Sequence, residues 1–306
     1  MNVGLIGSGK MGLPLALNMQ EHHHQVSVFV RKESAKEKLN HLKIAAFVDL
    51  KEWMASLTSP KIIWMMIPSG HQVDEMIERL RPHLEAGDVL IDGGNSHYKD
   101  TLRRHAALEG TGIHYMDIGT SGGIDGARNG ACLMVGGDER IFAYLEPLLK
   151  DIAMPNGYGY MGASGSGHYV KMIHNGIEYG MMQAIGEGFE VLKHADYELD
   201  LQRVANVWSH GSIIEGLLMR LTASALDKNA SLDAIEGIIN DSGEGRWTIE
   251  EALDLEVAVP TLTQALMTRY KSRDPLKFSE KVVASLRNEF GGHATFPRGK
   301  DAGSHE

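Results

Sequence analysis

Residues 2–12 read Asn-Val-Gly-Leu-Ile-Gly-Ser-Gly-Lys-Met-Gly, an apolar strand pattern that runs into a G-x-G-x-x-G turn. An apolar-periodic segment, 13–19, follows the turn and is typical of a helix. In such a turn Gly7 would allow a tight bend, Gly9 would let the backbone approach a pyrophosphate, and Gly12 would let the helix pack on the strand. Glycine-rich turns are common, but this one has a strand before it and a helix after it. The segment therefore predicts a dinucleotide-binding loop.

The second expected strand, 26–30, ends at Arg31 and Lys32. An NAD-binding loop has an acidic residue near this point, which binds the ribose 2′-hydroxyl. Two cations suit a 2′-phosphate instead, so the sequence favours NADP over NAD. Glu33 follows one or two positions late for the NAD role, and NAD remains the alternative.

The first half of the chain alternates strand and helix patterns. The expected strands are 2–6, 26–30, 43–47, 61–67, 88–92 and 114–118, with a further pair at 131–135 and 158–160. Such alternation predicts a parallel, Rossmann-type doubly wound sheet with helices on both faces. Strand patterns end near Ser164, and helical patterns continue to about Phe290. We therefore predict an α/β dinucleotide-binding domain over 1–163, an all-α substrate and dimerisation domain over 164–293, and a disordered tail over 294–306.

Composition excludes several classes of protein. The chain has 306 residues, is 43% hydrophobic and carries a net charge of −10 without a basic block, which argues against nucleic-acid binding. No leader and no membrane-spanning run is recognisable, so we expect a cytoplasmic protein. Cys132 is the only cysteine, so no disulfide forms within the chain, and its apolar neighbours predict a buried thiol. His22-His23-His24 lies in what we expect to be a solvated turn, without other ligands nearby, and we predict no metal site.

One later segment carries an ionisable stripe. Lys171, His174, Asn175, Glu178 and Tyr179 recur at the spacing of a single helix face. The other faces are apolar and contain Val170, Met172, Ile173, Ile177, Met181, Met182 and Ile185. The pattern predicts a mostly buried helix with a catalytic stripe, although a solvated lysine–glutamate pair is the common alternative.

Two glycine-rich segments follow expected strands. They are Asp92-Gly-Gly-Asn95-Ser96 and Gly119-Thr-Ser121-Gly122-Gly123. Ligands of open α/β sheets bind at the carboxyl ends of strands, so we expect both segments to contribute to one substrate site.

These motifs resemble those of 6-phosphogluconate dehydrogenases, in the β-hydroxyacid dehydrogenase superfamily. The resemblance covers most of the chain and is carried by 92–96, 121–123, 167–179 and the Arg-Asn-Glu-Phe-Gly-Gly-His segment at 287–293. Related hydroxyisobutyrate-type enzymes share the nucleotide loop and the lysine but lack the His-Asn-Gly-Ile-Glu-Tyr continuation.

The resemblance implies oxidative decarboxylation of 6-phospho-D-gluconate to D-ribulose 5-phosphate, with Lys171 as general base and Glu178 as acid. It implies substrate contacts from Asn95, Ser121, Gly122, Gly123, His174, Asn175, Tyr179, Arg269, Arg287 and His293, the last four residues meeting the phosphate. The expected cofactor-binding residues are Gly7, Gly9, Lys10, Met11, Gly12, Arg31, Lys32, Met66 and Asn95. Two other functions stay open: a dehydrogenase of another β-hydroxy acid, such as 3-hydroxyisobutyrate, without decarboxylation, and a catalytically silent nucleotide sensor or scaffold.

The chain departs from the family pattern in two ways. Longer members carry a second, duplicated set of helices, whereas this chain looks like the short form and is expected to be a homodimer or dimer of dimers, with Arg287 and His293 reaching a neighbouring subunit. Longer members also have a phosphate-binding lysine in a Gly-Gln-Lys-Gly segment, where this chain reads Asp-Ser-Gly-Glu-Gly-Arg at 241–246. Arg246 either replaces that lysine or is a salt-bridge residue of the following helix.

Overall fold

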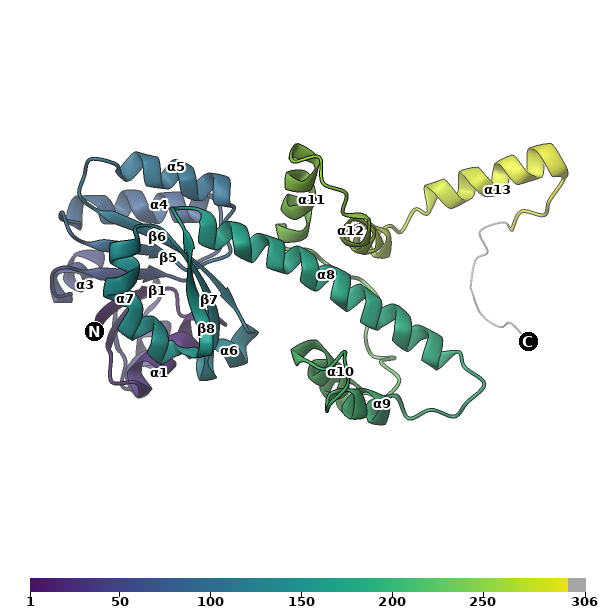
Figure 1. Cartoon of the computed structure of the whole chain (residues 1–306), viewed down its shortest axis with the longest axis horizontal. Coiled ribbons are helices and arrows are strands. Elements are labelled where there is room, and N and C mark those ends of the chain that lie inside the picture. Colours follow the sequence, from purple (N-terminus) through teal and green to yellow (C-terminus); the bar gives the residue numbers. More distant parts are fainter. Residues whose placement is uncertain (297–306) are drawn as a thin grey trace. The chain divides into compact units, whose positions relative to one another are not determined.

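A computed structural model describes residues 1–296 of the chain, and its first half is one eight-stranded sheet with helices on both faces (Figure 1). The strands are β1 (Asn2–Ile6), β2 (Gln25–Phe29), β3 (Ala45–Phe47), β4 (Ile62–Met65), β5 (Val89–Asp92), β6 (His114–Ser121), β7 (Ala131–Gly136) and β8 (Ala153–Gly162). Their order in the sheet is β3-β2-β1-β4-β5-β6-β7-β8. The predicted doubly wound α/β architecture is confirmed.

Helices of the α/β region cover the sheet because its strands bury side chains on both faces. In β4, Ile62 and Trp64 join one apolar core, whereas Ile63 and Met65 join the other. The first core also takes residues from α1 (Gly12–Glu21), α2 (Glu33–His41) and α7 (Glu139–Ile152). The second takes residues from α3 (Leu50–Ser56), α4 (His71–Leu80) and α5 (Tyr98–Leu108). A 3-10 turn, Arg81–His83, extends α4. Continuous apolar strands of this kind are typical of a parallel sheet covered on both sides.

The parallel sheet predicted from the first six strands is confirmed, and one later pair of strands is antiparallel. β7 pairs antiparallel with β6, while β8 pairs parallel with β7. Only residues 122–130, with the short helix α6 (Gly123–Asn129), connect β6 to β7. A parallel crossover needs about a dozen residues or more, so this connection reverses the chain, whereas the longer α7 returns it for a parallel β8. β8 also begins earlier than expected, at Ala153.

The helix with the ionisable stripe is α8 (Ser166–Lys193), 28 residues long. Its buried side contains Lys171, Asn175 and Tyr179, but Val170 is 37% exposed and Ile177 is 51% exposed. The expectation that its apolar faces would be buried is therefore wrong within a single chain. The helix turns its stripe toward β6 and toward α11 (Glu244–Asp254), which leaves the opposite apolar face uncovered.

The chain forms two compact units. The first contains residues 1–191 and 242–263, and the second contains residues 192–241 and 264–296. Elements of the second unit are α9 (Leu201–Trp208), α10 (Leu217–Lys228), the greater part of α12 (Pro260–Ser272) and α13 (Phe278–Gly291). The domain division at residue 164 stays a prediction. Of the predicted tail, residues 297–306 lie outside the described part of the chain.

Two local expectations are corrected. Cys132 is exposed, and it lies opposite Ser121 in the last residue pair of the β6–β7 ladder. His24 is buried, since its ring bonds the terminal amino group at 2.8 Å and Asp151 Oδ2 at 3.1 Å. Of the helices in residues 1–296, none combines the length and apolarity needed to cross a membrane.

Candidate active site

The glycines of the first turn have different environments. Gly7 has φ +99°, and a Cβ there would lie 2.4 Å from the Met66 carbonyl oxygen. A Cβ at Gly12 would lie 1.9 Å from the carbonyl oxygen of Gly7, whereas one at Gly9 would meet nothing within 4 Å. Gly7 and Gly12 are therefore required by close packing, and Gly9 faces open space. This arrangement fits a dinucleotide whose pyrophosphate approaches the backbone at Gly9.

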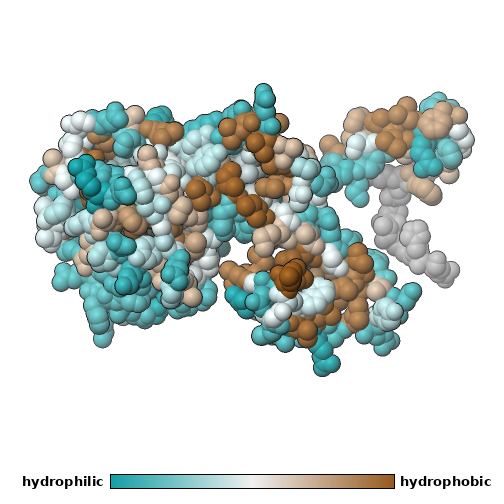
Figure 2. Space-filling model, in the orientation of Figure 1, coloured by the Kyte–Doolittle hydropathy of each residue, from teal (hydrophilic) through white to brown (hydrophobic). Residues whose placement is uncertain are grey.

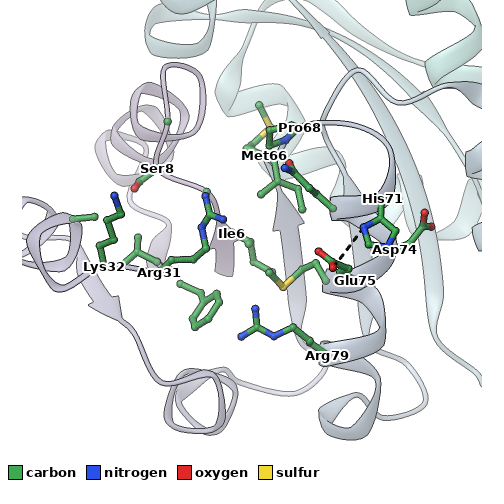
Figure 3. Close-up of a pocket in the computed structure, with 18 of the residues that line it drawn as sticks. Ile6, Ser8, Arg31, Lys32, Met66, Pro68, His71, Asp74, Glu75 and Arg79 are labelled. Carbon is green, nitrogen blue, oxygen red and sulfur yellow. Dashed lines mark ion pairs between the residues drawn. The ribbon is translucent and has the colours of Figure 1, made fainter.

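A pocket of about 960 Å³ adjoins this turn (Figure 3). Five of the predicted cofactor residues line it, namely Gly7, Gly9, Arg31, Lys32 and Met66. Its far wall is the face of α4 that includes His71, Gln72, Asp74, Glu75, Glu78 and Arg79. Lys10, Met11 and Gly12 at the start of α1, and Asn95 after β5, do not line this pocket among the described residues.

Only some of the charged side chains that line the pocket have a partner of opposite charge. Asp74 bonds Arg103 and Arg104, Glu75 lies 3.5 Å from the His71 ring, and Glu78 lies 3.7 Å from Arg81. Arg31, Lys32 and Arg79 have no carboxylate within ion-pair distance in the described chain, and the Arg79 guanidinium lies over the Phe29 ring at 5.5 Å. The unpaired charge in the pocket is thus positive. Arg79 was not predicted, because only the packing of α4 places its guanidinium over the Phe29 ring, in the pocket that Arg31 also lines (Figure 3).

Lys171 is brought to the sheet by two features of β6. Asp117 is fully buried, and its carboxylate accepts the backbone N–H groups of Gly165 at 2.7 Å and His168 at 2.9 Å. It thereby caps the first turn of α8, whose N–H groups have no partner within the helix. A Cβ at Gly119 would lie 2.3 Å from the Lys171 Cβ, so only glycine lets the helix pack this closely.

Burial lowers the pKa of Lys171, while Glu178, Glu244 and Cys132 act to raise it. Its Nζ lies 3.4 Å from His174 Nδ1, which in turn lies 2.9 Å from Asn175 Oδ1. The other ring nitrogen, His174 Nε2, lies 3.1 Å from Ser121 Oγ. Four predicted site residues therefore form one polar network, which begins at a buried amine with a lowered pKa. They are Lys171, His174, Asn175 and Ser121. Such a lysine is suited to act as a base.

Two carboxylates belong to the surroundings of Lys171. Glu178 Oε2 lies 3.9 Å from His174 Nδ1, and its side chain is 36% exposed. Glu244 is buried, and its carboxylate accepts a hydrogen bond from Ser242 Oγ. Glu244 was not predicted, because its nearness to Lys171 depends on how α11 packs against α8. The signal in the sequence was an acidic residue inside the segment 241–246.

Packing between α8 and α11 positions Tyr179. A Cβ at Gly245 would lie 2.4 Å from the Tyr179 ring, and the Tyr179 hydroxyl accepts the Ser242 N–H at 3.3 Å. Thr248 Oγ1 donates to the Met172 carbonyl oxygen at 2.8 Å across the same interface. Arg246 lies 3.4 Å from Glu250 one turn further along α11, which is the salt-bridge role considered for it.

Of the remaining predicted substrate residues, Gly122 and Gly123 directly follow Ser121, whereas the others are further away in the sequence. Asn95 is exposed after β5, and Gly122 and Gly123 open α6 with φ +108° and +64°. Arg269 Nη1 donates to the Asn240 carbonyl oxygen at 2.8 Å within the second unit. Arg287 lies on α13 of that unit, and the N–H of His293 bonds the Arg287 carbonyl oxygen at 3.4 Å. The roles of Arg269, Arg287 and His293 in phosphate binding stay predictions, as do the substrate contacts of Asn95, Gly122 and Gly123.

Fold and site together define a class: a dinucleotide-binding α/β protein with a buried lysine on the helix that follows the sheet, which is the arrangement of an NAD(P)-dependent dehydrogenase. Two family models match the chain, the NAD binding domain of 6-phosphogluconate dehydrogenase over residues 2–166 and the 6-phosphogluconate dehydrogenase C-terminal domain over residues 167–294. The chain belongs to the 6-phosphogluconate dehydrogenase family, as its motifs suggested.

Individual relatives agree with this assignment. A Bacillus subtilis protein named "Putative 6-phosphogluconate dehydrogenase YqeC" is 50% identical over 295 residues, which cover 96% of this chain and 99% of that protein. A Haloferax volcanii 6-phosphogluconate dehydrogenase, NAD-dependent and decarboxylating, is 39% identical over 96% of this chain and 98% of its own length.

Solved structures agree as well. The Plasmodium falciparum 6-phosphogluconate dehydrogenase is 31% identical with a TM-score of 0.82, covering 98% of this chain and 67% of that one. A Mycobacterium tuberculosis 3-hydroxyisobutyrate dehydrogenase is 22% identical with a TM-score of 0.70, covering 88% of this chain and 92% of that one, and this likeness concerns the fold alone.

Proposed function

We propose that the chain catalyses the oxidative decarboxylation of 6-phospho-D-gluconate to D-ribulose 5-phosphate and CO₂, with reduction of NADP or NAD. The observation that carries the proposal is the buried Lys171 with its lowered pKa, joined through His174 to Ser121 and Asn175. The names of the relatives support the same reaction.

The residues divide the acid–base work between them. When bound, the dinucleotide supplies a hydride acceptor at the sugar carbon that bears the reacting hydroxyl. Uncharged Lys171 takes the hydroxyl proton, and the resulting ammonium then stabilises negative charge on the ketone oxygen as CO₂ leaves. Glu178, two helical turns along α8, delivers a proton to the carbon that becomes C1 of the product. His174, Asn175 and Ser121 would hold the sugar hydroxyls, because they present both donors and acceptors on one side of Lys171.

A direct assay tests the reaction against its rivals. Initial rates with 6-phosphogluconate would be measured with NADP and NAD, together with released CO₂. We expect one CO₂ for each reduced dinucleotide. Reduction without CO₂ would favour a dehydrogenase of another β-hydroxy acid, and a lack of reduction with any such acid would favour a silent sensor or scaffold.

For the cofactor, we propose a preference for NADP. Arg31, Lys32 and Arg79 are the pocket cations without a carboxylate partner in residues 1–296, and a 2′-phosphate would supply the missing anion. The carboxylates that line the same pocket are already engaged with Arg103 and Arg104, with His71 or with Arg81. The NAD-dependent relative from Haloferax volcanii keeps NAD as the alternative.

Two substitutions distinguish these cofactors. Arg31→Asp should weaken NADP far more than NAD, because it removes a cation and adds repulsion. Arg79→Ala should raise the KM for NADP by about tenfold or more and leave that for NAD within about twofold, since a hydrogen bond to a charged group is lost. Arg140→Ala is the control, since Arg140 is exposed and pairs with Asp138, and neither of these residues lines the pocket. A wild type that strongly prefers NAD would refute the preference.

We also propose a homo-oligomer, most simply a two-fold dimer. No residue of α13 is buried in the described chain, although Phe278, Val282, Leu286 and Phe290 form a stripe at four-residue spacing and are 41% to 77% exposed. Apolar side chains also gather on the surface shown in Figure 2. The exposed apolar residues of α9, of α10 and of the turn between these helices include Val207, Ile213, Leu217 and Leu221. A second copy can bury such faces. The cytoplasmic location stays a prediction.

A further inference from the structure

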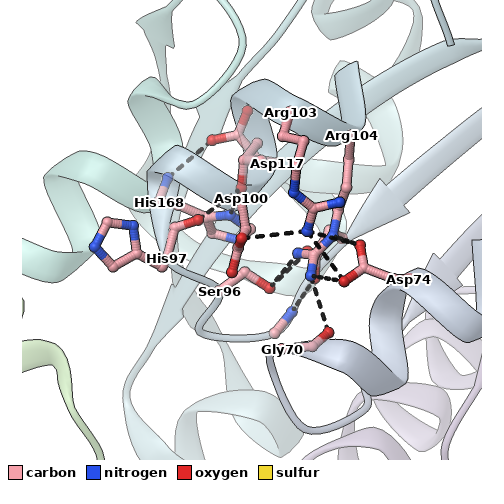
Figure 4. A network of polar contacts seen from close by, with 12 residues as sticks. Gly70, Asp74, Ser96, His97, Asp100, Arg103, Arg104, Asp117 and His168 are labelled. Atoms are coloured by element: carbon pink, nitrogen blue, oxygen red, sulfur yellow. Dashed lines mark hydrogen bonds and ion pairs between the residues drawn. The ribbon is translucent and has the colours of Figure 1, made fainter. Parts of the chain in front are cut away.

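A buried arginine connects two parts of the first unit that bind different ligands in the proposed function. Arg104 of α5 is 2% exposed, and its guanidinium lies between the N-terminal turn of α4 and the segment 92–96 (Figure 4). α4 forms a wall of the nucleotide pocket, and the segment 92–96 carries Asn95 of the predicted substrate site. The guanidinium itself lines neither site.

On the pocket side, the guanidinium is held in a fixed orientation. Its Nε bonds Asp74 Oδ1 at 2.7 Å, and Nη2 bonds Asp74 Oδ2 at 3.3 Å and the Gly70 carbonyl oxygen at 2.9 Å. Asp74 lines the pocket, and Gly70, at φ +90°, precedes the first residue of α4. Planar, bidentate pairing of this kind fixes the positions of both partners.

On the substrate side, the same group contacts the residues that shape the loop. Arg104 Nη1 lies 3.4 Å from Asp92 Oδ2 and 3.4 Å from Ser96 Oγ. Asp92 is fully buried, accepts Ser96 Oγ at 2.7 Å and accepts the Gly94 N–H at 3.2 Å. Asn95 is therefore flanked on both sides by residues that Asp92 holds. Tyr115 donates to Asp92 at 3.2 Å from β6 and completes the coordination of this carboxylate.

We infer that Arg104 is a positioning residue that couples nucleotide binding to the substrate loop. A nucleotide that contacts the first turn of α4 fixes Gly70 and Asp74. Because one rigid guanidinium bonds both of these and the Asp92–Ser96 pair, the loop that carries Asn95 becomes fixed as well. Arg104, Asp92 and Ser96 are buried, so no water replaces a contact that breaks on the loop side, and the loop follows the guanidinium. The inference rests on the proposed function, since it takes the pocket for the dinucleotide and the loop for the sugar acid.

The coupling can be measured without turnover. NADPH would be titrated by its fluorescence with and without saturating 6-phosphogluconate, and the ratio of the two dissociation constants is the coupling factor. Couplings between sites are commonly about 5- to 150-fold. We expect a factor in this range for the wild type and a factor close to one for Arg104→Lys, which keeps the charge but loses the bidentate geometry.

Controls separate coupling from stability and from the reaction. Arg103 is the other arginine that bonds Asp74, but it bonds Asp100 instead of the loop residues. Arg103→Ala should therefore keep the wild-type coupling factor. If Arg104→Lys does not fold, Asp74→Asn loosens the same guanidinium from its pocket side, and the ratio cancels any direct effect on nucleotide affinity. An unchanged factor in the folded variant would overturn the inference. Turnover of 6-phosphogluconate by the wild type is measured separately and reports only on the proposed function.

Discussion

Lys171 must lose its charge before it can accept a proton, and its neighbours oppose that loss. Burial lowers the pKa of the amine, whereas the carboxylates of Glu178 and Glu244 act to raise it. Replacing the amine by an apolar chain of similar length leaves the packing against Gly119 in place. Lys171→Met should therefore reduce kcat by a factor of about 10² to 10⁴, the usual contribution of a general base. The dissociation constant of NADPH should stay near the wild-type value. A variant with normal kcat would rule out Lys171 as the base.

Glu244 offers a test of the electrostatics around Lys171. Glu244→Gln removes a negative charge that raises the pKa of Lys171, so that pKa should fall. Activity requires the uncharged lysine, and it rises as pH increases through this pKa. The acidic limb of kcat/KM should therefore move to lower pH in the variant.

A matched control uses the same helix. Glu250 lies on α11, bonds Arg246 at 3.4 Å and has an exposed side chain. Glu250→Gln should leave the acidic limb in place. A limb that is unmoved in Glu244→Gln, or that moves equally in both variants, would contradict the electrostatic role of Glu244.

The sequence predicted the residues of the stripe but not all of their neighbours. Helical spacing alone places Lys171, His174 and Glu178 on one face, because that spacing is a local property of the chain. Glu244, Arg79 and Arg104 could not be found in this way. Each acquires its role from the packing of one helix against another element, and the sequence around each is that of an ordinary amphipathic or capped helix.

At the scale of elements, α8 is positioned by close contact with β6. Gly119→Ala would place a methyl group 2.3 Å from the Lys171 Cβ and 2.9 Å from the Gly167 carbonyl oxygen. Helix and strand must then separate, at a cost of about 1 to 3 kcal/mol in the free energy of unfolding. Because the displaced residue is Lys171 itself, we expect kcat to fall as well. Denaturant unfolding and steady-state rates would be measured on the same preparation.

Gly188→Ala is the control for this change, since it lies on the same helix and a Cβ there meets nothing within 4 Å. Alanine favours a helix over glycine by up to about 1 kcal/mol, so this variant should keep or gain stability and keep kcat. If Gly119→Ala had normal stability and normal kcat, the contact between β6 and α8 would not set the position of the lysine.

The elements also show which structural features the sequence patterns cannot predict. Strand and helix alternation located β1 to β6, because most of these strands are buried apolar runs between helices. It could not reveal that β7 reverses direction, since that depends on the short connection through α6. For α8, the apolar faces led to a prediction of burial, but part of this apolar surface is exposed in the single chain. A pattern records which faces avoid water but does not say which partner covers them.

At the scale of the whole molecule, the uncovered face of α13 and the position of Arg287 on the same helix lead to one prediction. If α13 packs on a second copy, Arg287 and His293 can complete the partner's site, and Lys171 and Arg287 of one site then come from different chains. Lys171→Ala and the double variant Arg287→Ala/His293→Ala would each be inactive alone. Refolded together, they should form hybrids with one intact site.

Random association makes half of the dimers hybrid, so activity should return to about a quarter of the wild-type level. The matched control mixes Lys171→Ala with Glu178→Gln. Both residues lie on α8 of the same chain, so no hybrid of these variants contains an intact site, and activity should stay absent.

Hybrids would be verified by mass spectrometry of differently tagged chains. Verified hybrids of the first pair without activity, or a fully active monomer of the wild type, would refute a shared site. Recovery in the first mixture alone would show that each active site needs two copies of the chain, because only an exchange of α13 between chains distinguishes the two mixtures.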